Sequence, residues 1–232
     1  MIDAFLLQDL GFSLPPPLDI LPLVLRGLQT TVYLTLAGAG LALLVAIIAG
    51  VARSSKFWLL RVVVGFYVEL FRGTSVLVQM FWAYYVLPFF GIDLSAFAAG
   101  TLALGLNVGA YGSEIVRSSI AAVPTGQTEA AIALNMSPVK RMQRIIFPQA
   151  IRRMIPPMGN LLIELLKVTS LAAFITIPEL TFEAKNLRIF APARTTEIFT
   201  TLLLVYFAIA FVLTMGVRWL ERRYSRGFVG GH

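Results

Sequence analysis

Cysteine is absent from the 232-residue sequence, and the only histidine is the terminal His232. The lack of cysteine excludes disulfide frameworks, thiolate metal sites and cysteine nucleophiles. Neither an H-E-x-x-H nor a G-x-S-x-G motif occurs, which argues against a membrane-bound enzyme. A G-x-x-x-x-G-K-[ST] phosphate loop is also missing, so the chain cannot hydrolyse ATP by that chemistry. We expect no metal or cofactor on this chain.

Charged residues are scarce, at 13% of the chain, whereas hydrophobic residues make up 58% and the mean hydropathy is +0.81. Soluble domains contain only about 45–50% apolar residues. The sequence therefore predicts an integral membrane protein. Its start, MIDAFLLQDLGFSLPPP, is acidic and has no basic region before the first apolar run, so we expect no cleaved export signal.

Five apolar stretches are long enough to cross a bilayer, which takes roughly 20 residues per helix. They are residues 23–52, 58–90, 95–117, 155–177 and 198–218. The second is too long for one straight span and contains ELFRGTS, Glu69 to Ser75, so we expect it to tilt or break there. No repeat or long linker divides the chain, which predicts one all-α membrane domain over residues 1–232.

The basic residues sort by side of the membrane. Those after spans 1, 3 and 5 should be cytoplasmic, which puts the N-terminus outside and the C-terminus inside. This cytoplasmic set is Arg53, Lys56, Arg61, Arg117, Lys140, Arg141, Arg144, Arg152, Arg153, Arg218, Arg222, Arg223 and Arg226. The opposite side receives Arg26, Lys185, Arg188 and Arg194 with Asp3, Asp9, Asp19, Asp93, Glu179, Glu183 and Glu197.

The largest cytoplasmic connection contains a polar segment, GQTEAAIALNMSPVKRMQRIIFPQA, residues 126–150. Thr128 to Leu134 favours a helix, with Glu129 expected near its positive N-terminal end. Asn135 tolerates the left-handed conformation that ends helices, and Ser137-Pro138 supplies an N-cap and a first-turn proline. The segment therefore predicts a helix, a tight turn and a second helix.

In the second helix, apolar and basic residues take opposite faces, and Phe147-Pro148 is expected to end it. The apolar face is Val139, Met142, Ile145 and Ile146, and the basic face is Lys140, Arg141 and Arg144. A basic amphipathic segment of this kind generally lies on anionic lipid. A family resemblance favours a more specific interpretation.

Five blocks of the chain resemble permease subunits of bacterial ABC importers, and in particular those of the polar amino acid uptake family. They are YVELFRGTSVLVQ (67–79), AYGSEIVRSSI (110–120), GQTEAAIAL (126–134), FPQAIRRMIPPMGN (147–160) and LLKVTSLAAF (165–174). The chain departs from the family pattern at Asn135, where Gly is usual, and at Ser75, where Pro is usual.

The resemblance implies the type I importer permease fold, in the bacterial inner membrane. It implies that residues 124–150 form a coupling loop that docks on an ATPase subunit, and that Glu129→Lys uncouples transport without unfolding the spans. The implied docking residues are Glu129, Ala130, Ala131, Asn135, Met136, Ser137 and Pro138, with Lys140, Arg141 and Arg144 at the rim.

The implied partners are an ATPase dimer carrying ATP and Mg²⁺, a second permease subunit, identical or homologous, and an extracytoplasmic solute-binding protein. No nucleic acid is implied. The family's solutes are polar amino acids and relatives such as opines and ectoines, and the sequence does not choose among them. The alternative is a secondary transporter or channel subunit, but five spans without a visible repeat argue against the former.

Polar residues inside spans are costly unless they are paired or face water, so each is a candidate for the substrate path or for packing. Glu164 and Lys167 lie on one face and suit either an ion pair or the path. Asn107, Tyr111 and Glu114 form a stripe for which interhelical hydrogen bonding is somewhat favoured over substrate contact. Gln79 is a weaker path candidate.

Three further patterns point mainly to packing. Glu69 and Arg72 are expected to pair at the break in span 2. Gly105 and Gly109 form a G-x-x-x-G pattern typical of close helix packing, either within the chain or between subunits. The aromatic run is interpreted first as an interfacial belt and second as a cage for a cation, and comprises Phe81, Trp82, Tyr84, Tyr85, Phe89 and Phe90.

Overall fold

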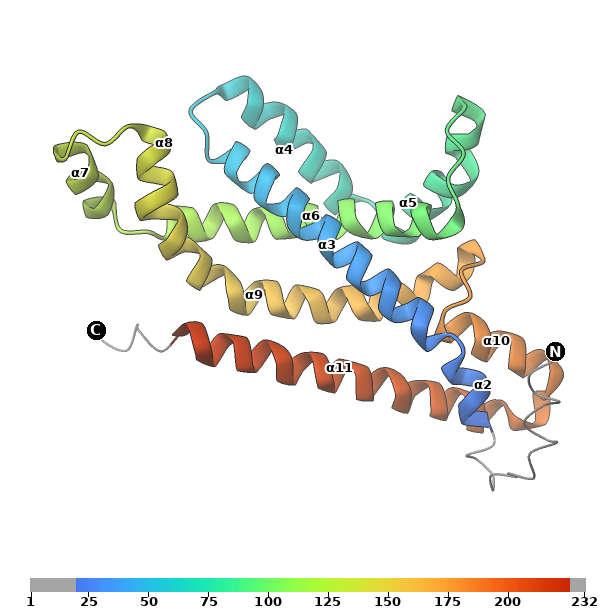
Figure 1. Ribbon diagram of the computed structural model, residues 1–232. Helices are drawn as coiled ribbons and strands as arrows, with labels where there is room; N and C mark the ends of the chain where they lie inside the picture. Colours follow the sequence, from blue (N-terminus) through green and yellow to red (C-terminus); the bar gives the residue numbers. More distant parts are fainter. Residues whose placement is uncertain (1–19, 226–232) are drawn as a thin grey trace.

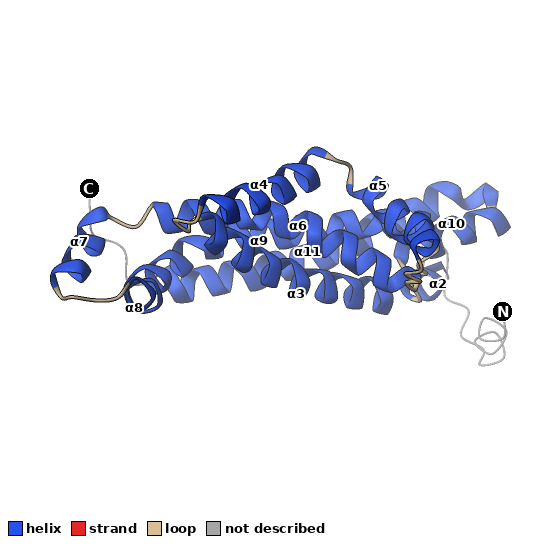
Figure 2. Ribbon diagram, turned by 90° about the horizontal axis from the view of Figure 1, so that it is seen from above, coloured by secondary structure: helices blue, strands red, loops and turns tan. Residues whose placement is uncertain are grey.

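The computed structural model describes residues 20–225, and every regular element among them is helical (Figures 1 and 2). The expectations placed on Asp3, Asp9, Asp19, Arg226 and the export signal lie outside these residues. The long helices are α3 (Leu28–Arg53), α4 (Trp58–Gly73), α6 (Ala96–Ala121), α9 (Phe147–Val168) and α11 (Thr195–Ser225).

Shorter helices connect the long ones. They are α2 (Leu21–Leu25), α5 (Val76–Phe81), α7 (Thr125–Ala133), α8 (Pro138–Arg141) and α10 (Leu180–Phe190). The π-helical turns are η2 (Trp82–Val86) and η4 (Met142–Ile146), and the 3₁₀ segments are η3 (Leu87–Phe90), η5 (Thr169–Ile175) and η6 (Pro192–Arg194).

Within the described residues, three helical stretches are long and apolar enough to cross a membrane: Leu28–Arg53, Pro138–Ile175 and Pro192–Tyr224. The pair Trp58–Gly73 and Val76–Phe90 passes the same test together and bends by 105° between its parts. The predicted break in span 2 is therefore confirmed. The remaining predicted span, α6, does not pass this test, so up to four of the five predicted spans are supported. It has 26 residues, as α3 has, but carries more glycine and polar side chains.

Several predicted boundaries shift. Span 1 was expected from residue 23, but the helix is interrupted at Arg26 and Gly27, so the long helix begins at Leu28. A side chain at position 27 would lie 2.4 Å from backbone atoms of Glu179 and Leu180, so this close crossing requires glycine. Span 5 is longer than expected, because α11 continues to Ser225.

Helix α6 is the centre of the bundle and packs closely along α3. A methyl group on Gly105 would lie 2.5 Å from Leu41, and one on Gly109 would lie 2.8 Å from Val45. The G-x-x-x-G pattern thus serves packing within the chain, which is one of the two interpretations of the sequence. Figures 1 and 2 place α7, α8 and the end of α11 at one end of the bundle, and α2 and α10 at the other.

Candidate functional site

The loop of residues 124–150, the coupling loop, begins with α7 and a tight turn. Asn135 adopts the left-handed conformation with φ of 54°, as the sequence predicts. The Met136 N–H donates to the Ala131 carbonyl at 3.0 Å, and the Asn135 N–H donates to the Ile132 carbonyl at 2.8 Å. These two bonds form a Schellman motif, which fixes the direction in which the chain leaves α7.

The second helix of the loop starts as predicted but does not end where it was expected to. The Ser137 hydroxyl accepts from the Lys140 N–H at 3.4 Å, and Pro138 occupies the first turn. The helix nevertheless continues past Pro148. In the π-helical turn η4 the Phe147 N–H donates to the Met142 carbonyl, and this wider turn accommodates the proline in the first turn of α9. The expected stop at Phe147-Pro148 is wrong.

This continuity joins the coupling loop to a membrane span. Residues Pro138–Ile175 form one helical stretch of 38 residues, so α9 begins earlier than the expected boundary at residue 155. Pro156 and Pro157 lie inside it without ending it, as neighbouring helices permit in membrane proteins. Helix α8 and the span are therefore parts of one continuous helical stretch.

The tip of the coupling loop exposes apolar side chains that the sequence did not single out. Leu134 is 76% exposed, Val139 63% and Ile132 57%. Val139 belongs to the predicted apolar face of the second helix, and it is exposed rather than packed. Exposed apolar residues gathered at one place indicate an interaction site.

The polar candidates surround this tip. Glu129 is exposed and lies in the middle of α7 rather than in its first turn, so the expected complement to the helix dipole is wrong. Ala131 is buried and packs inside the loop. The other candidates are exposed or partly exposed: Ala130, Asn135, Met136, Ser137, Pro138, Lys140, Arg141 and Arg144.

Polar contacts close the base of the coupling loop. The Arg153 guanidinium on α9 donates to the Ala122 carbonyl at the end of α6. Gln149 donates to the Gln127 side chain at 3.4 Å, which links α9 to α7. The two chain segments that enter and leave the loop are therefore held together.

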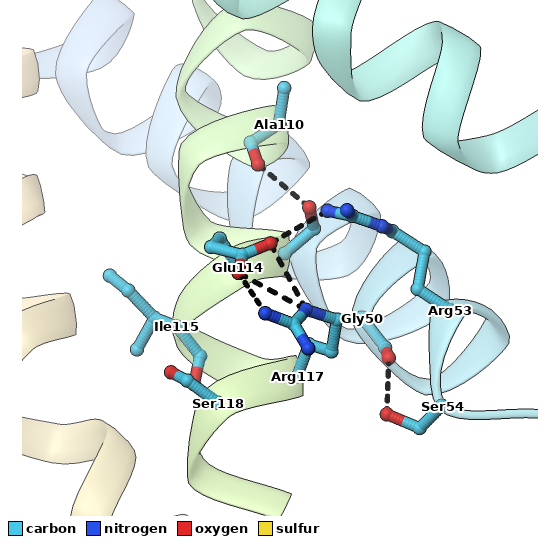
Figure 3. A network of polar contacts seen from close by, with 9 residues as sticks. Gly50, Arg53, Ser54, Ala110, Glu114, Ile115, Arg117 and Ser118 are labelled. Atoms are coloured by element: carbon cyan, nitrogen blue, oxygen red, sulfur yellow. Dashed lines mark hydrogen bonds and ion pairs between the residues drawn. The ribbon is translucent and has the colours of Figure 1, made fainter. Parts of the chain in front are cut away.

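A second network, shown in Figure 3, centres on Glu114, about two turns before Ala122 along α6. Arg53 at the end of α3 donates to Glu114 at 2.7 Å, and Arg117 donates to the same carboxylate through Nε at 3.1 Å. The Glu114 and Arg53 side chains are only 33% and 18% exposed. Glu114 therefore ties α3 to α6 near the loop, and no sequence spacing indicated Arg53 as its partner.

The other two residues of the α6 stripe, Asn107 and Tyr111, form hydrogen bonds to the backbone at the break in span 2. Asn107 donates to the Phe71 carbonyl at 2.7 Å, and Tyr111 donates to the Arg72 carbonyl at 3.3 Å. Gln79 donates to the same Phe71 carbonyl at 2.9 Å. The last turn of α4 would otherwise leave these carbonyls without partners in an apolar environment. Interhelical hydrogen bonding is thus what these side chains do in this structure.

Two ion pairs that the helical spacing allows do not form among the described residues. Arg72 stacks over the Tyr111 ring, with its guanidinium carbon 5.2 Å from the centroid, instead of pairing with Glu69. Glu164 and Lys167 are both exposed on α9 and form no ion pair with each other. Their exposure leaves the path interpretation as the one still open for this pair.

A buried carboxylate at the other end of the bundle was not predicted as a site residue. Glu179 is fully buried, caps α10 by accepting from the Phe182 N–H at 2.8 Å, and accepts from the Tyr206 hydroxyl at 2.7 Å. Burial raises the pKa of Glu179 above its ordinary value. The carboxylate joins the start of α10 to α11, which sequence spacing alone did not indicate.

The aromatic run gathers at the end of span 2. Tyr84 and Tyr85 have ring centroids 4.8 Å apart, and those of Trp82 and Phe90 are 6.3 Å apart. Phe89 is 88% exposed and Phe90 70%. Exposed rings at a span end suit an interfacial belt.

Comparison with known proteins assigns the family. Residues 42–226 match the binding-protein-dependent transport system inner membrane component. The chain belongs to this family. It is 44% identical over 207 residues to a probable amino-acid ABC transporter permease of Sinorhizobium fredii, covering 87% of each chain. The family expected from the five sequence blocks is confirmed.

Two other relatives of this permease have named solutes. This permease is 38% identical to the L-cystine transport system permease protein TcyB of Bacillus subtilis, over 88% of each chain. It is 34% identical to the glutamine transport system permease protein GlnP of Escherichia coli, over 88% of this chain and 93% of the relative.

Solved structures agree with the fold of the permease. An amino acid ABC transporter crystallised with histidines matches with a TM-score of 0.82 and 31% identity, over 91% of this chain and all of the other. The methionine transporter MetNI matches with a TM-score of 0.73 at 17% identity, over 91% and 99%, and supports the fold alone. The predicted type I importer permease fold is confirmed.

Proposed function

We propose that this chain is one permease half of an ATP-driven importer for polar amino acids or related compounds, including opines and ectoines. Its coupling loop docks on a separate ATPase subunit that carries ATP and Mg²⁺, and an extracytoplasmic binding protein delivers the solute. The single observation that carries the proposal is the exposed apolar tip at Leu134, on a loop continuous with a membrane span.

The tip has the composition of a docking element. Apolar side chains at the centre of an interface supply most of its affinity, and a polar rim supplies orientation. Leu134, Ile132 and Val139 form the apolar centre here, and Glu129, Lys140, Arg141 and Arg144 form the rim.

The loop is also built to transmit force. The Schellman turn at Asn135 fixes α7 against α8, and α8 continues into α9. Arg153 and Glu114 fasten the loop base to α6 and α3. Closure of two ATPase subunits therefore moves these helices together, as a rigid-body switch between inward-open and outward-open states.

Charged groups on α9 support a paired arrangement. Glu164 and Lys167 are exposed in a single chain although they lie within a span, where contact with lipid is costly. A second permease half, identical or homologous, leaves them facing a shared water-filled path. In that arrangement Glu164 and Lys167 contact solute, whereas Gln79, Asn107 and Tyr111 act by packing.

The orientation follows from the same arrangement. The coupling loop, the α3–α4 connection and the end of α11 lie at one end of the bundle (Figure 1). The basic residues at these positions favour the cytoplasmic side for this end. The N-terminus is then outside and the C-terminus is inside, in the bacterial inner membrane.

The docking proposal is tested by co-purification of the permease with its ATPase. Leu134→Asp places a charge at the apolar centre of the tip and should abolish the association. Thr125→Asp, at the exposed start of α7, adds the same charge away from the tip and should leave it intact. Equal retention of the ATPase by both variants contradicts the proposal, as does ATP-independent uptake driven by an ion gradient.

A further inference from the structure

A groove of about 450 Å³ lies between α3, α6, α9 and α11, away from the coupling loop tip and the charged pair on α9. Its size falls in the range of ligand sites, roughly 300–1,000 Å³. Every residue that lines it is apolar or glycine, and one example from each helix is Leu43, Val108, Met158 and Val217. It therefore lacks the polar groups that would orient an amino acid.

The groove and the charged pair lie on opposite sides of α9. Successive residues of a helix are rotated by about 100°, so Leu162, which lines the groove, points away from Asn160 and Glu164. Asn160, Glu164 and Lys167 are all exposed on the other side. In our proposal, the charged side of α9 faces a water-filled path or a second permease half. The groove lies on the opposite side of this helix.

The helices around the groove run toward the basic end of the bundle. Figure 1 shows α3 crossing obliquely while α11 runs beside α9, so that α3 and α11 diverge toward the end of α11. The lining residue Ile151, near the start of α9, precedes Arg152. The lining residue Val217 of α11, which lies against Gly159, precedes Arg218. Both arginines are exposed, and neither forms an ion pair among the described residues.

The other charged residues near the end of α11 are also mainly basic. Arg222 and Arg223 follow on α11, and Arg223 stacks over Trp219 at 5.5 Å. Glu221 is the one acidic residue among Arg218 to Ser225. Basic residues between span ends on the cytoplasmic side attract anionic lipid headgroups.

We propose that this groove binds one acyl chain of an anionic phospholipid of the cytoplasmic leaflet, with Arg152 and Arg218 contacting its phosphate. The acyl chain of the lipid fills the apolar space between α3 and α11 that no side chain occupies.

The test uses the full chain in phosphatidylcholine vesicles that contain a trace of phosphatidylglycerol or phosphatidylcholine with a photoactivatable acyl chain. The expected result is labelling concentrated in residues 39–47 and 151–165, with phosphatidylglycerol preferred. Arg152→Gln and Arg218→Gln should each lower this preference about fivefold. Labelling needs neither ATPase nor solute, so its outcome is separate from that of the transport proposal.

A matched pair of variants distinguishes the groove from the general lipid surface. Leu43 lines the groove and is 51% exposed, whereas Leu44 does not line it and is 57% exposed. Leu43→Trp should fill the groove and reduce labelling several-fold, and Leu44→Trp should not. Equal labelling of both variants would overturn the proposal, and so would cross-linking of position 43 to a second permease chain.

Discussion

The Arg53 guanidinium donates to the Glu114 carboxylate at 2.7 Å and joins the end of α3 to α6 beside the coupling loop. Both side chains are largely shielded from solvent, and Arg117 shares the same carboxylate. Glu114→Gln removes the charge and leaves two arginines without their counter-ion, which should lower the unfolding free energy by about 1–3 kcal/mol.

Thermal unfolding of the purified chain in detergent measures the effect of Glu114→Gln. Glu197→Gln is the control, because Glu197 pairs with Arg194 within one turn and is 43% exposed. A pair of that kind contributes less than about 1 kcal/mol. If both variants unfold at the same temperature, Glu114 does not fasten α3 to α6.

Glu129→Lys tests the coupling loop without disturbing the spans. Glu129 is exposed and makes no ion pair among the described residues, so the unfolding temperature should stay unchanged. We expect solute uptake in vesicles to fall strongly while ATP hydrolysis by the partner continues. Loss of the folded permease, or unaltered uptake, would count against the assigned role.

Asn135 tests the turn geometry. Its φ of 54° is natural for glycine and strained for a β-branched residue. Asn135→Val should cost about 1–2 kcal/mol and reduce ATPase co-purification, because the turn holds α7 against α8. Asn135→Gly should retain both stability and association. A valine variant that associates as well as the glycine variant would show that the turn conformation is dispensable.

Gly105 tests the packing of α3 on α6. A methyl group there would meet three atoms of Leu41 at 2.5–2.7 Å, so Gly105→Ala should destabilise the chain by about 1–3 kcal/mol. Gly40→Ala is the matched control, since nothing lies within 4 Å of its added methyl group. In a helix that change should stabilise by about 0.5–1 kcal/mol. Unfolding temperatures shifted in the same direction would refute this packing.

Glu179 gives stability a pH dependence with a defined sign. Burial raises its pKa, so the folded chain holds the proton more tightly than the unfolded chain does. Its contribution is fully present below the ordinary glutamate pKa of roughly 4.3 and is lost as pH rises through the folded value. The unfolding temperature of wild type should therefore fall relative to that of Glu179→Gln as the pH rises. A difference independent of pH would mean that Glu179 does not titrate in this range.

Local chemistry predicted much of the coupling loop. Asn135 and Ser137-Pro138 each have a conformational preference that does not depend on tertiary contacts. Both ends of the turn therefore have the expected conformation. The break in span 2 was predictable from the length of the apolar stretch and from the segment ELFRGTS inside it. Pro148 was misjudged, because a π-helical turn can carry a helix past a proline and the sequence gives no sign of such a turn.

Tertiary partners were much harder to predict. Helical spacing put Glu69 beside Arg72 and Glu164 beside Lys167. Arg72 instead stacks over the Tyr111 ring, and Glu164 has no ion-pair partner within residues 20–225. Glu114 instead met Arg53, 61 positions away. Spacing shows which residues share a helix face, whereas the neighbouring helix decides which of them pair.

In the proposed function, the coupling loop transfers the work of a separate ATPase to the membrane helices. The decisive experiment measures uptake of labelled amino acid into vesicles that contain the permease, its ATPase and its binding protein. We expect uptake to require ATP and to be lost when the ATPase is omitted or when the permease carries Leu134→Asp. Uptake at an undiminished rate without the ATPase would contradict it.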